Sequence, residues 1–100
     1  MSRDEALTRL RARERELRAM GIVHLSIFGS TARGDGRADS DVDLAAAIDY
    51  DAVRKLGPFG FFGIEDEIAK MIGAKVDLVT EPTRHPRLQA EIDRDRVHVF

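Results

Sequence analysis

The chain has 100 residues, a formal net charge of −2 and no cysteine. This length predicts one small domain spanning residues 1–100. The near-neutral charge argues against direct binding of nucleic acid through bulk electrostatic attraction, and the lack of cysteine excludes disulfides, thiolate catalysis and cysteine-ligated zinc. No apolar run is long enough to span a membrane and the charged N-terminus lacks a signal-peptide core, so we expect a cytoplasmic protein.

The N-terminal part predicts a charged helix followed by a buried strand. Ser2 and Glu5 form a capping-box pattern, and apolar residues at helical spacing continue the helix until Gly21 ends it. The run 22–28 is short, apolar and β-branched, which is typical of a buried strand.

A Gly-Ser pair separates this strand from the next one. Ser30 can open one helical turn that Gly34 closes, and a polar, glycine-rich loop follows. Residues 41–48 alternate as in a second strand, with one apolar face and one face that carries Asp41 and Asp43.

The second half predicts a helix over 61–72 that Gly73 stops, a third strand over 75–80, a short helix containing Leu88 and Ile92, and a last short strand. The connection from 49 to 60 can hold another short helix. The order of elements predicts an α/β (α+β) fold with a small mixed β-sheet flanked by helices.

Three aspartates carry the chemistry that the sequence suggests. Asp41 and Asp43 project from the same face of a strand because side chains at i and i+2 point the same way. Asp77 lies in another short apolar strand and can join them if the two strands are neighbours. Oxygen ligands of this kind suit Mg²⁺, and a cluster of three fits two ions that bracket a phosphoryl group. The alternative for the pair is a solvated sheet edge, and for Asp77 a capping role.

The Gly-Ser pair is a candidate phosphate site. Gly29 allows an anion to approach the backbone closely, and the Ser30 hydroxyl and nearby N–H groups can bind it. Arg33 lies one turn further and can either reach a phosphate or form a salt bridge that steadies the acidic cluster. The segment matches neither a Walker motif nor an EF-hand loop.

Several other residues are better explained by structure than by function. We interpret Asp39 as a loop cap and Ser40 as structural, and His24 as a core or rim histidine. The aromatic group Phe59, Phe61 and Phe62 can stack on an adenine, although a core or partner-contact role is the favoured interpretation.

The stretch GSTARGDGRADSDVDL resembles the Gly-Ser, spacer, Asp-x-Asp signature of the nucleotidyltransferase superfamily that includes DNA polymerase beta. With GIEDEIAKMIGAKVDLV after it, nearly the whole chain is similar to the minimal nucleotidyltransferases (MNT). The resemblance implies that Asp41, Asp43 and Asp77 bind Mg²⁺, that Asp77 also helps deprotonate the acceptor, and that Gly29 and Ser30 bind the phosphates of ATP. It assigns Arg33 to the nucleotide site as well.

The resemblance also implies a partner. Many minimal nucleotidyltransferases are antitoxins that transfer AMP to a tyrosine of a HEPN-domain RNase toxin, in a type VII-like toxin-antitoxin pair. Such a short chain would need a partner or a second copy of itself to present the acceptor. Two rival functions stay open: a nucleotide- or partner-binding module that neutralises its partner by contact, and a nucleotidyltransferase that acts on a small molecule or an RNA end.

Overall fold

The computed structural model describes residues 1–37, 39–55, 57 and 60–100, with the backbone alone for 61 and 62. Its elements, in chain order, are α1 (Arg3–Arg11), α2 (Glu14–Ala19), β1 (Ile22–Phe28), α3 (Gly29–Arg33), β2 (Val42–Ile48), α4 (Tyr50–Arg54), α5 (Gly60–Ile72), β3 (Val76–Thr80), α6 (Pro86–Asp95) and β4 (Val97–His98). In the described part of the chain, no helix has the length and apolar character to cross a bilayer.

The strands form one mixed sheet in the order β3-β2-β1-β4. Strands β2 and β3 run parallel, because α4 and α5 return the chain to the same end of the sheet. Strand β1 is antiparallel to both β2 and β4. The predicted small mixed sheet flanked by helices is therefore confirmed.

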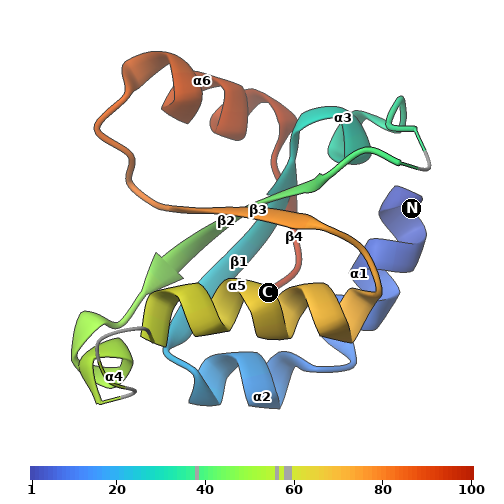
Figure 1. The fold of residues 1–100 in the computed structure, drawn as a ribbon. Helices are drawn as coiled ribbons and strands as arrows, with labels where there is room; N and C mark the ends of the chain where they lie inside the picture. Colours follow the sequence, from blue (N-terminus) through green and yellow to red (C-terminus); the bar gives the residue numbers. More distant parts are fainter. Residues whose placement is uncertain (38, 56, 58–59) are drawn as a thin grey trace.

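Helices cover the two faces of the sheet unequally (Figure 1). Helices α1, α2 and α5 cover one face, where their apolar residues and those of the strands form the main core. On the opposite face of the described structure, α6 packs against the sheet over a small cluster of Phe28, Ala45 and Ile92. Because side chains alternate along a strand, the residues between the main-core positions of β2 and β3 point to this thinly covered face.

The predicted N-terminal helix is two helices in the structure. The Ser2 hydroxyl accepts a hydrogen bond from the Glu5 N–H at 3.1 Å, as the capping box predicts. However, the backbone leaves the helical region at Arg13, which starts α2. Just before this break, the Arg11 guanidinium donates hydrogen bonds to carbonyl oxygens in the last residues of the chain. This tertiary contact, which periodicity does not reveal, fastens the end of α1.

The other predicted elements are found within a residue or two. Helix α3 begins at Gly29, one residue before the predicted Ser30, and Gly34 ends it in the left-handed region as expected. His24 is exposed, so it is a rim histidine. The predicted role of Phe59, Phe61 and Phe62 concerns parts of the chain that the structure does not describe. Phe59 lies outside the described residues, as do the side chains of Phe61 and Phe62.

An ion-pair network ties α6 to the sheet. The Arg96 guanidinium donates to both carboxylate oxygens of Glu81, to the Asp93 carboxylate and to the buried Ser26 hydroxyl. Glu81 is 11% exposed and Arg96 is 21% exposed. The hydrogen bonds from Arg96 hold the pKa of Glu81 below its ordinary value. The network therefore fixes α6 over its face of the sheet.

Replacing Arg96 with methionine leaves the Glu81 carboxylate buried without its main partner. We expect a loss of about 2–3 kcal/mol in the free energy of unfolding, measured by urea titration at neutral pH. Since the folded-state pKa of Glu81 is lowered, its contribution is present above the ordinary carboxylate pKa and is lost as the pH falls through the folded value. The difference in free energy of unfolding between wild type and Arg96→Met should therefore shrink in acid. Arg87→Met, an exposed change on the same helix, is the control and should cost little.

Candidate functional site

The three predicted aspartates lie on two neighbouring strands. Asp43 of β2 and Asp77 of β3 are direct register partners in the parallel pair. Partners in a parallel pair point to the same face, so both carboxylates lie on the face that α6 covers only in part. Asp41 precedes β2 by one residue and is exposed. The structure thus confirms the neighbouring strands on which the predicted three-aspartate cluster depends.

Asp43 is the most confined member of the cluster. Its side chain is half-buried, whereas Asp41 and Asp77 are exposed. Burial raises the pKa of Asp43 above its ordinary value, and the negative charges of Asp77, Asp41 and Glu91 raise it further, while Arg33 acts in the opposite direction. Negative charge is therefore concentrated here in excess of nearby positive charge, an environment that favours a bound cation.

Gly29 lies directly against the side chain of Asp43. It has a φ of +70°, and a Cβ built on it would overlap a carboxylate oxygen of Asp43. The φ favours glycine at this position because L side chains rarely adopt it, and a side chain here would also force the Asp43 carboxylate to shift. The Gly-Ser turn and the aspartate strand are therefore packed directly against each other.

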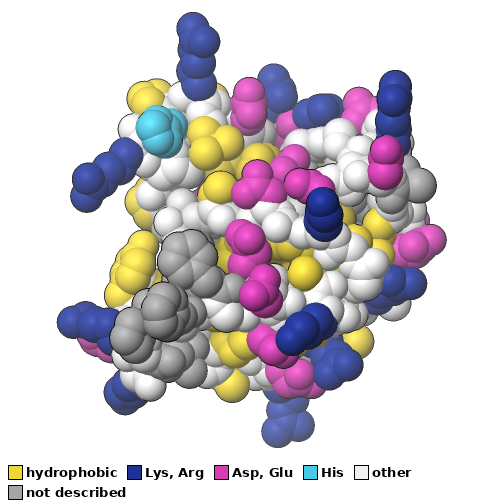
Figure 2. Space-filling view, in the orientation of Figure 1, with side chains coloured by type: hydrophobic (Ala, Val, Ile, Leu, Met, Phe, Trp, Pro, Cys, Tyr) yellow, Lys and Arg dark blue, Asp and Glu magenta, His cyan; other side chains and the backbone are white. Residues whose placement is uncertain are grey.

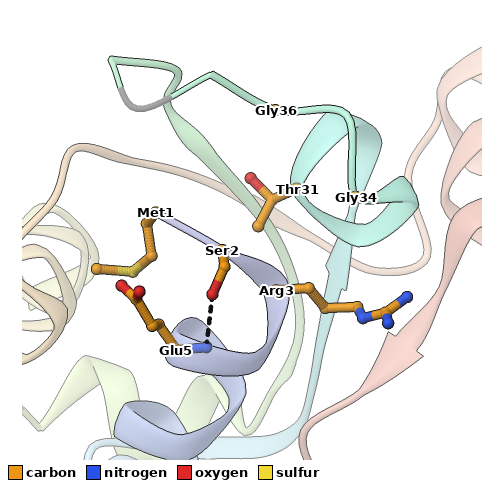
Figure 3. Close-up of a pocket in the computed structure, with 7 residues that line it drawn as sticks. All are labelled: Met1, Ser2, Arg3, Glu5, Thr31, Gly34 and Gly36. Carbon is orange, nitrogen blue, oxygen red and sulfur yellow. Dashed lines mark hydrogen bonds between the residues drawn. The ribbon is translucent and has the colours of Figure 1, made fainter.

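Ser30 lies close to Gly36, in the loop that follows α3. A Cβ built on Gly36 would come within 3.3 Å of the Ser30 hydroxyl oxygen and 3.4 Å of the Thr31 nitrogen. A cavity of about 460 Å³ adjoins this turn, between the start of α1 and the segment from Thr31 to Gly36 (Figure 3). Thr31, the residue after Ser30, thus borders an open space that the start of α1 helps to form.

Arg33 is held by carboxylates outside the aspartate cluster. Its guanidinium donates to Asp95 of α6 at 2.7 Å and to Asp35 at 3.3 Å. The Asp95 side chain is only 5% exposed. The positive charge of Arg33 offsets part of the rise in the pKa of Asp43. Its predicted contact with a phosphate stays a prediction, and in this structure its salt bridges connect α3 with α6.

Helix α6 brings two residues that the sequence analysis missed. Glu91 adds negative charge near Asp43, and Asp95 holds Arg33. They lie one helical turn apart, which in sequence looks like an ordinary solvated face. Only the packing of α6 against the sheet reveals their roles. Ser40, in contrast, accepts a hydrogen bond from the Arg37 N–H, in keeping with the structural role expected of it.

Acidic side chains gather over the middle of the face shown in Figure 2, whereas Lys and Arg side chains project mainly around its rim. The donors in the cluster are all carboxylate oxygens, which are ligands that hard divalent cations prefer. Among residues 1–37, 39–55, 57 and 60–100, no three acidic or histidine side chains are already arranged as ligands of one ion. The chemistry of the donors and the concentrated charge fit Mg²⁺.

Comparison with known proteins identifies the class. The family model described as polymerase beta, nucleotidyltransferase matches residues 15–100. The protein adenylyltransferase MntA of Thermococcus cleftensis is 31% identical over 91 residues, which cover 90% of this chain and 88% of that protein. A solved minimal nucleotidyltransferase matches with a TM-score of 0.68 and 30% identity, over 97% of this chain and 95% of that one.

The chain therefore belongs to the polymerase beta nucleotidyltransferase family, and the predictions of family and enzyme class are confirmed. A more distant match is the structure of a tri-AMPylated HEPN toxin from Shewanella oneidensis in complex with its MNT antitoxin. Its TM-score is 0.58 at 16% identity, over 90% of this chain and 68% of that one, which is a likeness in fold alone.

Exchanging Gly29 for alanine tests the contact with Asp43. Both Gly29→Ala and the control Gly34→Ala place alanine at a positive φ, which costs about 1–2 kcal/mol by itself. Only Gly29 also has a carboxylate where the Cβ must go, since nothing lies within 4 Å of a Cβ at Gly34. We expect thermal melts to show a clearly larger loss for Gly29→Ala. Equal losses would contradict the close packing described here.

Neutralising Asp43 should stabilise the metal-free protein. Because the folded-state pKa of Asp43 is raised, its ionised form costs stability at neutral pH. This cost falls as the pH drops below the folded value and is gone below the ordinary carboxylate pKa. We expect Asp43→Asn to raise the melting temperature at pH 7 in a chelator and the gain to vanish in acid. Asp66→Asn, the same change at an exposed site on α5, should show no such dependence.

Proposed function

We propose that this protein transfers AMP from ATP, with Mg²⁺, to a hydroxyl group of a partner protein. The observation that carries the proposal is the register of Asp43 with Asp77, together with the packing of the Asp43 carboxylate against Gly29. This arrangement offers carboxylates for metal-bound phosphates next to the backbone N–H groups of the Gly29–Ser30 turn. Family membership supports nucleotidyl transfer as the reaction.

Asp41, Asp43 and Asp77 are the residues that would hold Mg²⁺. When bound, Mg²⁺ would supply positive charge that neutralises the triphosphate and the leaving pyrophosphate. Gly29 and Ser30 would bind the phosphates through backbone N–H groups and the hydroxyl. Arg33 would add a charged contact once its salt bridges to Asp35 and Asp95 exchange for a phosphate.

The transfer itself is an in-line displacement. The acceptor oxygen attacks the α-phosphorus of ATP and forms a new P–O bond, while the bond from this phosphorus to the bridging oxygen breaks and pyrophosphate leaves. Asp77 accepts the proton of the acceptor hydroxyl, a role for which its exposed position at the sheet face leaves room. Positioning and electrostatic stabilisation supply most of the rate enhancement.

The comparisons support a protein acceptor. MntA of Thermococcus cleftensis is named a protein adenylyltransferase, and the Shewanella structure pairs an MNT antitoxin with an AMPylated HEPN toxin. By this likeness, we propose a tyrosine of a HEPN-domain toxin as the acceptor and an antitoxin role in the cytoplasm for this chain.

The test is the intact mass of a HEPN-domain partner after incubation with this protein, ATP and Mg²⁺. Wild type should add one or more AMP groups, and the double variant Asp41→Asn/Asp43→Asn should reduce the rate at least about a hundredfold. Asp66→Asn is the matched control and should transfer normally.

Two outcomes would contradict the proposal. The partner could gain no mass with wild type despite forming a stable complex, or the double variant could neutralise the toxin as well as wild type. Either result would favour neutralisation by contact, the binding-module alternative. Chelation with EDTA should abolish transfer by wild type, and its persistence would remove Mg²⁺ from the proposal.

A further inference from the structure

Strand β3 forms one edge of the sheet. The main-chain groups of odd-numbered residues along this segment point toward β2. At its two ends, the Lys75 carbonyl accepts a hydrogen bond from the Val42 N–H, and the Glu81 N–H donates one to the Ala46 carbonyl. The main-chain groups of Leu78 and Thr80, at even positions, therefore point away from the sheet. Outward main-chain groups of this kind can pair with an added strand.

Glu65 of α5 already occupies part of this edge. Its carboxylate accepts a hydrogen bond from the outward N–H of Leu78 at 3.1 Å. A carboxylate oxygen here takes the place that a main-chain carbonyl of an added strand would occupy. Leu78 is 5% exposed, so an incoming strand would have to displace the Glu65 carboxylate to pair with its N–H.

A groove of about 480 Å³ lies along the same edge. Its walls come from β3, from the segment that leads into α6, from Leu88 of α6 and from Tyr50 of α4, which is 60% exposed. Arg84 and His85 lie on its lip and are exposed. The groove thus combines an apolar floor, outward main-chain groups and positive charge.

The groove leads to the aspartate cluster. Leu78, Val79 and Thr80 line it, and Asp77 is the next residue along the strand. At about 3.3 Å per residue, an extended segment lying beside Thr80 and Leu78 reaches Asp77 within a few residues. Asp77 and Val79 share a face, so a side chain on that face of the added segment would project toward the cluster.

We infer that this groove binds the acceptor segment of the partner protein as an extended, acidic strand added to β3. Arg84 and His85 would bind its acidic residues, while its hydroxyl-bearing residue lies beside Asp77. Acidic residues of the segment would be attracted to Arg84 at the rim of the groove and repelled by the aspartate cluster. This difference would orient the segment along the groove. This inference rests on the proposed function for the identity of the occupant.

The experiment measures binding without chemistry. The probe is a fluorescein-labelled copolymer of glutamate and tyrosine, titrated in the absence of ATP and followed by fluorescence anisotropy. Thr80→Pro removes the outward N–H and is compared with Thr80→Ala, which keeps it. Arg84→Glu is compared with Arg87→Glu, the same charge change on exposed α6 outside the lining of the groove. Thermal melts establish that each variant is folded.

We expect Thr80→Pro and Arg84→Glu each to weaken binding about tenfold, with both controls within about twofold of wild type. No binding by wild type, or equal binding by Arg84→Glu and Arg87→Glu, would overturn the inference. Transfer of AMP is then measured separately on the HEPN-domain partner. Groove-dependent binding without any transfer by wild type would leave the docking groove in place and contradict the proposed function.

Discussion

The parallel pairing of β2 with β3 is the constraint on which the site depends. Its register sets Asp43 beside Asp77 on one face of the sheet, where burial and then the neighbouring negative charges disfavour ionisation of Asp43. An arrangement of this kind lowers the stability of the free protein. Under the proposed function, a bound cation would offset this concentration of negative charge.

The unequal covering of the sheet leaves room for the site. The main core under α1, α2 and α5 holds most of the fully buried apolar residues. The opposite face carries only the small cluster around Phe28, Ala45 and Ile92, and it leaves Asp77 exposed. One face therefore supplies most of the apolar burial, and the other carries the charged residues of the proposed site.

Helix α6 connects the parts of the site with the fold. Arg96 fastens its end to Glu81 and the buried Ser26, while Asp95 holds Arg33 of α3. The helix thereby links α3, which begins with the Gly-Ser pair, to the sheet. The edge groove beside β3 lies at the other end of the same helix, so α6 borders both the proposed nucleotide site and the proposed acceptor route.

Local patterns in the sequence determined the elements and the candidate residues. Alternation placed Asp41 and Asp43 on one face of a strand, and glycines marked the ends of helices, because these signals depend only on neighbouring residues. The tertiary structure decided which strands are neighbours, and hence that Asp77 faces Asp43. It also split the first helix, engaged Arg33 with Asp95 and set a carboxylate against Gly29, since contacts between residues distant in sequence leave no periodic pattern.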